Sequence, residues 1–332
     1  MLRFYNKIII CILLLTVFIF SGCSNKSHLK TRSSGTFPPY EVIDARGEAV
    51  RLSGKPQRIV SLTYGTDEIL VALVPLKRIV AFSKWAGDQE ITFISKEVAG
   101  AVGCRACGSC EQIVRLEPDL VLASVATDGD LINSIEAVGI PVFVASSPKD
   151  YRQVKEKVMA VAAAVAEKEA GELLVQKMDS HLEWLDGILA GVARSSRKSV
   201  VAFSFSGPIG RRGQLFDDML KRARVINAVS EQSIFEQDAV IGKEKIIACN
   251  PDMLLLPTWN YNGKNNAVDY AKHILNDPAY AELKAVKMKQ VKFVSDRYRY
   301  VASHHYTDAV ENIARAVYPE AFKSQEKRFR NN

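Results

Sequence analysis

The sequence predicts an α/β protein made of two similar lobes joined by a long helix. Three observations support this fold class. Short apolar runs flanked by turn residues alternate with stretches of helical periodicity, a pattern typical of parallel α/β structure. One motif occurs twice, starting at Glu111 and at Glu244. Between the two copies lies a segment of about 45 residues without strand patterns or proline, so it predicts helices only.

The strands and helices of each half follow from these patterns. In the first half we expect strands over 58–62, 77–83, 119–124 and 140–146, with helices over 67–73 and 130–139. In the second half we expect strands over 199–205, 251–257 and 291–295, with helices over 213–223 and 303–318. The alternation favours a parallel sheet in each half.

The middle segment predicts two consecutive helices. Val154, Val158 and Val161 recur at helical spacing, and a second apolar stripe begins at Leu174. We expect the second helix over about 168–193. Such a helix would be ~39 Å long, enough to reach from one lobe to the other.

The repeated motif reads E-x-I-[IV]-x-x-x-P-D and is followed by an apolar run. Its two copies start 133 residues apart, at Glu111 and Glu244. The pattern predicts a short helix, a proline that stops it and a strand that enters the core. Each lobe should therefore contain one such corner.

The chain begins with a segment typical of export. Arg3 and Lys7 precede an apolar run over 8–20, whose 13 residues are too few to span ~30 Å of hydrocarbon. Ser21 and Gly22 stand directly before Cys23, which resembles a bacterial lipobox with Phe20 in place of the usual Leu. We expect Cys23 to carry lipid and to anchor the mature protein outside the cytoplasm. The alternative is an ordinary signal peptide with an incidental cysteine.

These features predict a division of the chain into six parts. They are a signal peptide (1–22), a tether (23–39), an N-terminal lobe (40–150), a helical segment (151–195), a C-terminal lobe (196–320) and a basic tail (321–332).

Charge and motifs exclude several function classes. The formal net charge falls from +7 to +5 once residues 1–22 are removed, and no basic stripe is interleaved with aromatic residues, so nucleic-acid binding is not expected. The sequence has no G-x-G-x-x-G, Walker A or G-x-S-x-G pattern, so we do not expect an enzyme.

Several ordered motifs together resemble the substrate-binding proteins of ABC importers for iron chelates and cobalamin. They are RIVSLTYGTDEILVAL, EQIVRLEPDLVLAS, GQLFDDMLKRARVINAV, KEKIIACNPDMLLLP and HILNDPAYAELKAVKMKQVKFV, within about 58–322. The resemblance implies two Rossmann-like lobes bridged by one helix, with ligand bound between them and no intrinsic cofactor. It also implies an ABC permease and its ATPase as partners, a monomer, and only a small change of lobe angle on binding.

The resemblance assigns a role to the repeated glutamates. In this family each lobe presents a glutamate to arginine pockets of the permease, and Glu111 and Glu244 occupy the matching positions. The alternative is that each glutamate complements the dipole at its own helix N-terminus.

Aromatic and basic residues at expected strand ends are the candidate ligand contacts, because they suit a large, flat or anionic ligand. The candidates are Tyr64, Trp85, Arg211, Arg212, Trp259, Tyr261, Arg297, Arg299, Tyr300, His304 and His305. The two histidines open the last expected helix and could also hold a metal or haem iron. We therefore expect the ligand to be a ferric siderophore-type chelate, with cobalamin or haem as alternatives.

Cys104, Cys107 and Cys110 follow one another at C-x-x-C spacing in the loop before Glu111. This loop could hold a disulfide, idle thiols, or a thiolate that contacts the ligand or a metal, as some haem-binding relatives take an axial side chain from it. A lipoprotein metal chaperone that uses these cysteines is therefore a third possible function. Cys249 is expected to be a buried small hydrophobe.

Overall fold

The computed structural model describes residues 37–106, 108–231, 241–260, 263 and 266–323. These residues all belong to one unit, residues 34–332. The expected signal peptide, Cys23, most of the expected tether and residues 324–332 lie outside the described residues. Among the helices described, none is both long and apolar enough to cross a membrane.

The first lobe is built on a parallel sheet in the order β5-β4-β3-β6-β7. Its strands are β3 (Ile59–Ser61), β4 (Ile79–Ser83), β5 (Arg105–Ala106), β6 (Leu120–Ser124) and β7 (Val142–Ala145). An antiparallel hairpin, β1 (Tyr40–Ile43) and β2 (Ala49–Leu52), precedes the sheet and was not predicted. The chain runs from β3 outward to β4 and β5, then returns across the sheet to β6. The adjacent strands β3 and β6 are thus a topological switch point.

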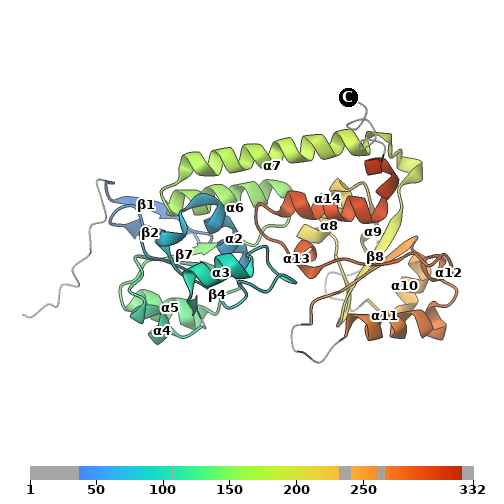
Figure 1. Cartoon of the computed structure of the whole chain (residues 1–332), viewed down its shortest axis with the longest axis horizontal. Helices are drawn as coiled ribbons and strands as arrows, with labels where there is room; N and C mark the ends of the chain where they lie inside the picture. The colour runs from blue at the N-terminus through green and yellow to red at the C-terminus, as the bar shows by residue number, and fades with distance from the viewer. Residues whose placement is uncertain (1–36, 107, 232–240, 261–262, 264–265, 324–332) are drawn as a thin grey trace, which may run out of the picture. The chain divides into compact units, whose positions relative to one another are not determined.

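Helices cover both faces of this sheet (Figure 1). They are α2 (Tyr64–Leu73), α3 (Lys96–Val102), α4 (Cys110–Arg115), α5 (Gly129–Ala137) and α6 (Tyr151–Ala164). Alternate strand residues enter different cores. Ile59 and Leu120 belong to the cluster that includes α2 and α6, whereas Val60 and Val121 pack with residues of α4 and α5. Burial on both faces explains why these strands are continuous apolar runs.

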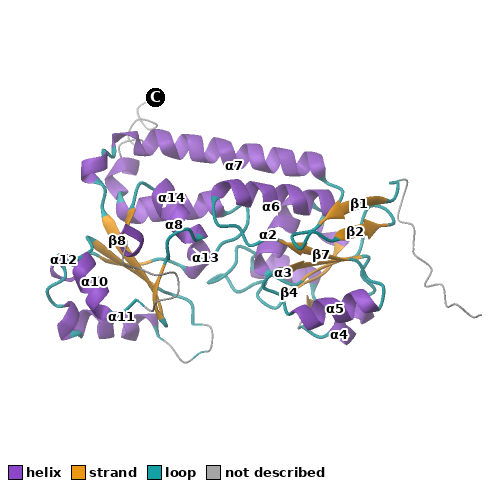
Figure 2. Ribbon diagram, turned by 180° about the vertical axis from the view of Figure 1, so that it is seen from behind, coloured by secondary structure: helices purple, strands orange, loops and turns teal. Residues whose placement is uncertain are grey.

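One long helix, α7 (Lys168–Ile188), follows α6 as expected. It ends five residues before the predicted residue 193, and the chain continues as a 3-10 turn over Leu189–Gly191. Its length is therefore ~32 Å rather than the expected ~39 Å. Figures 1 and 2 both show α7 running above α6 and α14 (Tyr306–Val317), which it contacts.

The second lobe contains a sheet in the order β10-β8-β11-β12, with β9 antiparallel to β8. Its strands are β8 (Ser199–Ser204), β9 (Gly207–Ile209), β10 (Ile226–Asn227), β11 (Met253–Leu256) and β12 (Val291–Phe293). Its helices are α8 (Leu215–Arg222), α9 (Ala228–Glu231), α10 (Lys243–Cys249), α11 (Ala267–Asn276), α12 (Lys284–Lys287), α13 (Asp296–Arg299) and α14. Strands β9 and β10 and helices α9, α11, α12 and α13 were not predicted.

The repeated motif forms the same corner in both lobes. The short helix α4 or α10 ends near a residue of positive φ, Glu117 (45°) or Asn250 (38°), directly before the proline. The Asp119 carboxylate then accepts the Arg58 N–H at 2.8 Å, while the Asp119 N–H donates to the Arg58 carbonyl at 3.0 Å. The helix-stop-strand prediction is confirmed.

Asp252 repeats this exchange in the second lobe. Its carboxylate accepts the Ser199 N–H at 2.8 Å, and its N–H donates to the Ser199 carbonyl at 2.9 Å. The aspartate of the P-D dipeptide is therefore explained by its role as hydrogen-bond acceptor at the start of the neighbouring central strand. Charge-assisted bonds of this kind are about twice as strong as neutral ones.

The two lobes share one apolar core. A single cluster of buried side chains includes Leu120 from the first sheet, Leu182 from α7, Leu255 from the second sheet and Ile313 from α14. A separate cluster covers the other face of each sheet. Because the shared cluster passes through α6, α7 and α14, the connection between lobes is packed rather than a bare linker.

A buried carboxyl group fixes α2 against the end of β4. Asp67 lies in the first turn of α2 and is fully buried. It accepts the Ser83 N–H at 3.1 Å and the Ser83 Oγ–H at 2.6 Å. Burial raises the pKa of Asp67 from the ordinary 3.8 to about 7.

We predict that Asp67 makes the protein less stable as pH rises from about 4 to about 7. In that window the native state holds a proton that the unfolded chain has lost, so the free energy of unfolding falls with pH, by on the order of 4 kcal/mol in total. Asp67→Asn can keep both contacts with Ser83 and should lose this pH dependence. Urea unfolding measured across the window tests it. Asp130→Asn, at an exposed position of α5, is the matched control. If Asp67→Asn keeps the wild-type dependence of stability on pH, the prediction is wrong, whereas Asp130→Asn should keep it.

Candidate functional site

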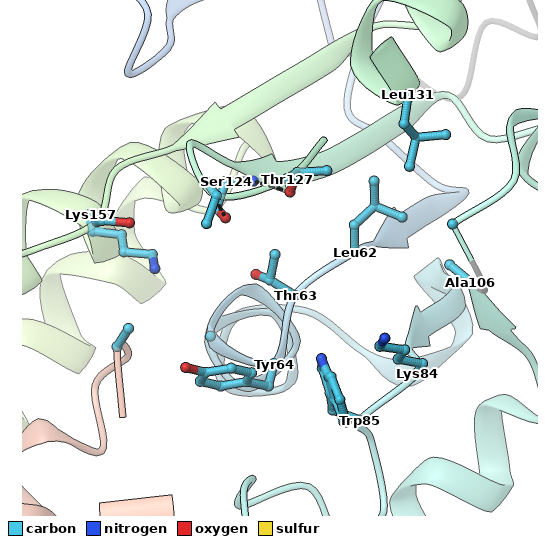
Figure 3. Close-up of a pocket in the computed structure, with 15 residues that line it drawn as sticks. Leu62, Thr63, Tyr64, Lys84, Trp85, Ala106, Ser124, Thr127, Leu131 and Lys157 are labelled. Atoms are coloured by element: carbon cyan, nitrogen blue, oxygen red, sulfur yellow. Dashed lines mark hydrogen bonds between the residues drawn. The ribbon is translucent and has the colours of Figure 1, made fainter. Parts of the chain in front are cut away.

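A cavity of about 370 Å³ lies at the carboxyl ends of the first lobe's strands. It adjoins the ends of β3, β4, β5 and β6, and so occupies the topological switch point where α/β sheets bind ligands. Its volume is within the range of small-molecule sites. Figure 3 shows the residues that line it, namely Leu62, Thr63, Tyr64, Gly65, Lys84, Trp85, Ala106, Gly108, Ser124, Ala126, Thr127, Leu131, Ser147, Lys157 and Ala302.

The N-terminus of α2 forms one wall of the cavity. Thr63 is the N-cap, and its side chain accepts the Thr66 N–H at 3.3 Å. The next two residues, Tyr64 and Gly65, line the cavity. The first backbone N–H groups of a helix have no intrahelical acceptor and carry the positive end of its dipole. This wall therefore favours negative charge.

A tight turn after β6 forms the opposite wall. The Ser124 N–H donates to Thr127 Oγ1 at 3.0 Å, and the Ala126 N–H donates to Ser124 Oγ at 3.2 Å. Each hydroxyl oxygen thus accepts one backbone N–H. A hydroxyl group that accepts in this way still has its own proton to donate.

Lys157 reaches the cavity from α6. It is 4% exposed, and burial lowers the pKa of its ammonium group from 10.5 to about 8. Within the described chain it makes no hydrogen bond or ion pair, and the charge that acts on it is that of Glu68. A pKa lowered this far means that burial destabilises the charged form by roughly 3 kcal/mol. Figure 3 shows its side chain extending toward the N-terminus of α2.

Glu68 lies beside this wall and joins the two lobes. It is 2% exposed. Its Oε1 accepts the Thr92 hydroxyl at 2.8 Å and the Phe93 N–H at 2.9 Å, and its Oε2 accepts the Ser303 hydroxyl at 2.5 Å. These three bonds hold the carboxylate toward Thr92, Phe93 and Ser303, and among the described residues it does not form a direct ion pair with Lys157.

Aromatic side chains from both lobes meet at the rim. The Trp85 and Trp259 rings lie edge to face with centroids 5.4 Å apart. Trp259 Nε1 donates to Asp88 Oδ2 at 2.9 Å, and the Tyr64 hydroxyl donates to the Tyr300 carbonyl at 3.0 Å. Of the predicted cleft residues, Tyr64 and Trp85 line the cavity, while Trp259 and Tyr300 border those two.

Other predicted cleft residues stand further from this cavity. The Arg297 guanidinium lies over the Phe93 ring at 5.1 Å, and the His305 ring stacks on the same ring at 4.0 Å. Arg212 donates to the Ser230 carbonyl at 2.9 Å, and Arg211 is exposed beside it. Tyr261 lies outside the described residues.

Arg299 was predicted to contact the ligand, but it is buried within the second lobe. It is 2% exposed, pairs with Asp296 at 3.0 Å and donates to the Phe203 carbonyl. Asp296 in turn accepts the N–H groups of Thr258 and Trp259, each at 2.8 Å. Arg299 is thus committed to holding the Trp259 loop, because its guanidinium group is enclosed by the second lobe.

The histidine pair precedes the last helix instead of opening it, since α14 begins at Tyr306. His305 Nδ1 lies 2.5 Å from Asp308 Oδ2. Burial lowers the pKa of His304 to about 3, so this residue stays neutral near physiological pH. Neither histidine lines the cavity of Figure 3. Within the described part of the chain, no cluster of three or more His, Cys, Asp or Glu could hold a metal ion.

The cysteine loop borders the cavity through Ala106 and Gly108. Cys104 and Cys110 are free thiols that pack against the apolar core under α4 and α5. Cys107 lies outside the described residues. Cys249 is free and half-buried against the second lobe's core, where its Sγ lies 3.2 Å from the Ala228 carbonyl oxygen.

Sequence reasoning missed the polar part of the cavity. Ser124 ends a predicted strand and Thr127 follows it, so their position at a sheet edge was a usable signal. Lys157 was a subtler case, because it falls within the apolar stripe of Val154, Val158 and Val161. A lysine on the buried face of a helix is rarely there without a reason.

Comparison with known proteins agrees with this geometry. A model of the periplasmic binding protein family matches residues 59–298. The chain is 25% identical to the uncharacterized ABC transporter substrate-binding lipoprotein YvrC of Bacillus subtilis over 321 residues, 94% of this chain and 96% of YvrC. It is 24% identical to the probable siderophore-binding lipoprotein YfiY of the same organism, covering 86% and 89% of the two chains.

A solved structure shows the same fold. The periplasmic heme-binding protein RhuT from Roseiflexus superimposes with a TM-score of 0.67 at 21% identity, covering 80% of this chain and 99% of RhuT. Two parallel-sheet lobes, a long helix between them and a family match across both lobes lead to one conclusion. The chain belongs to the periplasmic binding protein family.

Proposed function

We propose that this protein is a lipid-anchored, extracytoplasmic binding protein that captures an anionic ferric chelate and delivers it to an ABC permease. The cavity at the carboxyl edge of the first sheet is the observation that carries the proposal. It combines aromatic walls, Tyr64 and Trp85, with the two ammonium groups of Lys84 and Lys157. The names of YvrC and YfiY support the lipoprotein and transport parts. On this proposal the protein binds and releases its ligand without changing it chemically.

The composition of the cavity favours an anionic chelate over a neutral one. Hydroxyl groups, ammonium groups and a helix N-terminus all stabilise negatively charged oxygen. Aromatic rims provide stacking surface for the organic part of a chelate. Haem, the ligand in the name of RhuT, and cobalamin are the competitors against which the proposal is tested.

Delivery requires a surface that the permease recognises, and we assign it to Glu111 and Glu244. Both are exposed in the first turn of their helices, directly before the two equivalent corners. The Glu111 side chain is 74% exposed and pairs with Arg115 at 2.5 Å. Such exposed pairs contribute only about 0.3–0.5 kcal/mol, so an arginine of the permease could replace Arg115 at little cost.

The first prediction of this proposal concerns the ligand. The protein is titrated with ferric siderophores, cobalamin and haem while intrinsic tryptophan fluorescence is recorded. An anionic ferric siderophore should change the fluorescence at micromolar concentration or below. Trp85→Phe should remove most of the response, because Trp85 lines the cavity. Trp184→Phe is the matched control, because Trp184 is exposed on α7. If none of these compounds changes the fluorescence at micromolar concentration, the proposal is wrong.

The second prediction separates docking from binding. Glu111→Ala and Glu244→Ala should leave chelate affinity unchanged, because neither residue lines the cavity. Uptake should fall with either variant and most with both, since removing one partner of a desolvated interfacial pair costs about 2–5 kcal/mol. Substitution by Arg should be worse than Ala.

The control for docking is Glu97→Ala, another exposed first-turn glutamate of the first lobe but outside the repeated motif. Its uptake should equal that of the wild type. Full transport by the Glu111→Ala/Glu244→Ala double variant would show that the repeat serves folding only.

A further inference from the structure

We infer that Lys157 and the first turn of α2 form an anion subsite at the floor of the cavity, which holds a carboxylate or similar oxyanion group of the ligand. The inference rests on the proposed binding function and deepens it by assigning the ligand's charge. Three observations support it: a buried cation without a partner, a helix N-terminus beside it, and hydroxyl donors across from both.

The first observation is the state of Lys157. Its side chain is 96% removed from solvent, since 4% of the residue is exposed, and it points into the cavity (Figure 3). Its helical neighbours Val154, Val158 and Val161 are completely buried, so the stem crosses apolar surroundings. Across the described residues its ammonium group has neither a hydrogen-bond acceptor nor an ion-pair partner. Buried charges are normally paired, so this one lacks the anion it would need.

The second observation is the place of the ammonium group. A Cβ added at Gly65 would lie 3.3 Å from Lys157 Nζ and 3.2 Å from the Ala302 carbonyl oxygen. The ammonium group therefore lies against the N-terminus of a ten-residue helix, α2. That end of a helix repels a cation and attracts an anion. One anion between the ammonium group and the helix N-terminus would stabilise both of them.

The third observation is the set of donors on the opposite wall. Ser124 and Thr127 each accept a backbone N–H through the hydroxyl oxygen, so each hydroxyl keeps its own proton to donate. Both residues line the cavity with Lys157. An oxyanion in the cavity could thus receive the Tyr64 and Gly65 N–H groups, these hydroxyls and the ammonium group. The ammonium group and the backbone N–H groups of this set can only donate, so the set favours carboxylate oxygens over a neutral donor group.

Glu68 does not remove the need for an anion. Its carboxylate contributes negative charge near Lys157, but its three hydrogen bonds hold it toward Thr92, Phe93 and Ser303. The other charged or titratable groups at the cavity are Lys84 and Tyr64. Lys84 adds a further positive charge, so the cavity as a whole stays cationic.

The test compares the wild type with Lys157→Met, which keeps an unbranched side chain one heavy atom shorter and removes its charge. Ligands are ferric citrate, citrate without iron, molybdate and a neutral ferric trihydroxamate, measured by calorimetry and by thermal shift. Ferric citrate should bind the variant at least tenfold more weakly than the wild type. The neutral chelate, if it binds, should change by less than about threefold.

Two more variants sharpen the test. Gly65→Ala keeps the charge but crowds the ammonium group, so it should also weaken ferric citrate. Lys168→Met removes an exposed lysine at the start of α7 and should have no effect. Without ligand, Lys157→Met should unfold at a higher urea concentration than the wild type, because it removes an uncompensated buried charge.

The outcomes distinguish this inference from the proposed function. Equal binding of ferric citrate to wild type and Lys157→Met would overturn the anion subsite and leave the binding function intact. A second outcome is that no chelate binds, but citrate or molybdate raises the melting temperature of the wild type and not that of Lys157→Met. This result would overturn the proposed chelate and support the subsite. If no anion stabilises the wild type, or if Lys157→Met is less stable than the wild type, the inference is wrong. Response to both citrate forms indicates a carboxylate site, and response to molybdate alone indicates a site for free oxyanions.

Discussion

The site depends most on the hydrogen bonds that the buried carboxylate of Glu68 accepts. It lies in α2, holds the 92–93 turn through two hydrogen bonds, and reaches Ser303 from the segment that leads into α14. One buried group therefore fixes a helix of the first lobe, a loop of the first lobe and the segment that returns from the second. Its negative charge also acts on Lys157 and raises the pKa of that ammonium group, against the effect of burial. Its three hydrogen bonds hold it toward these neighbours, so it orders the cavity wall without forming an ion pair with Lys157.

Aspartate side chains have a similar role elsewhere in the fold. Asp119 and Asp252 stabilise equivalent corners by exchanging hydrogen bonds with a residue at the start of a central strand, Arg58 directly before β3 and Ser199 in β8. Asp67 holds α2 to the end of β4, and Asp296 holds the loop that carries Trp259. In each case a buried or half-buried aspartate side chain accepts backbone N–H groups at or near one end of a strand, where they would otherwise be unpaired. These carboxylates position the loops, and the loops form the site.

The connection between lobes limits how the protein can move. The shared apolar cluster runs through α6, α7 and α14, and a packed core of this kind resists continuous deformation. A helix also bends less readily than a pair of crossing strands. The rim contacts, such as Trp85 with Trp259 and Tyr64 with Tyr300, join side chains that are partly exposed. Ligand entry should therefore depend on rearrangement of rim side chains and loops more than on a large rotation of the lobes.

The sequence by itself determined the α/β alternation, the duplicated corner, the long middle helix and the edge of the first sheet where Tyr64 and Trp85 lie. These features are encoded by periodicity and turn residues within short windows, so they are readable locally. Only the tertiary structure decided which polar groups share the cavity. Residues 62–65, 84–85, 124–127, 157 and 302 are far apart in sequence and meet through the strand order. It also buried Arg299 against Asp296 and left Lys157 unpaired, although both are basic residues in helices. Burial and partner are properties of packing, and no local pattern specifies them.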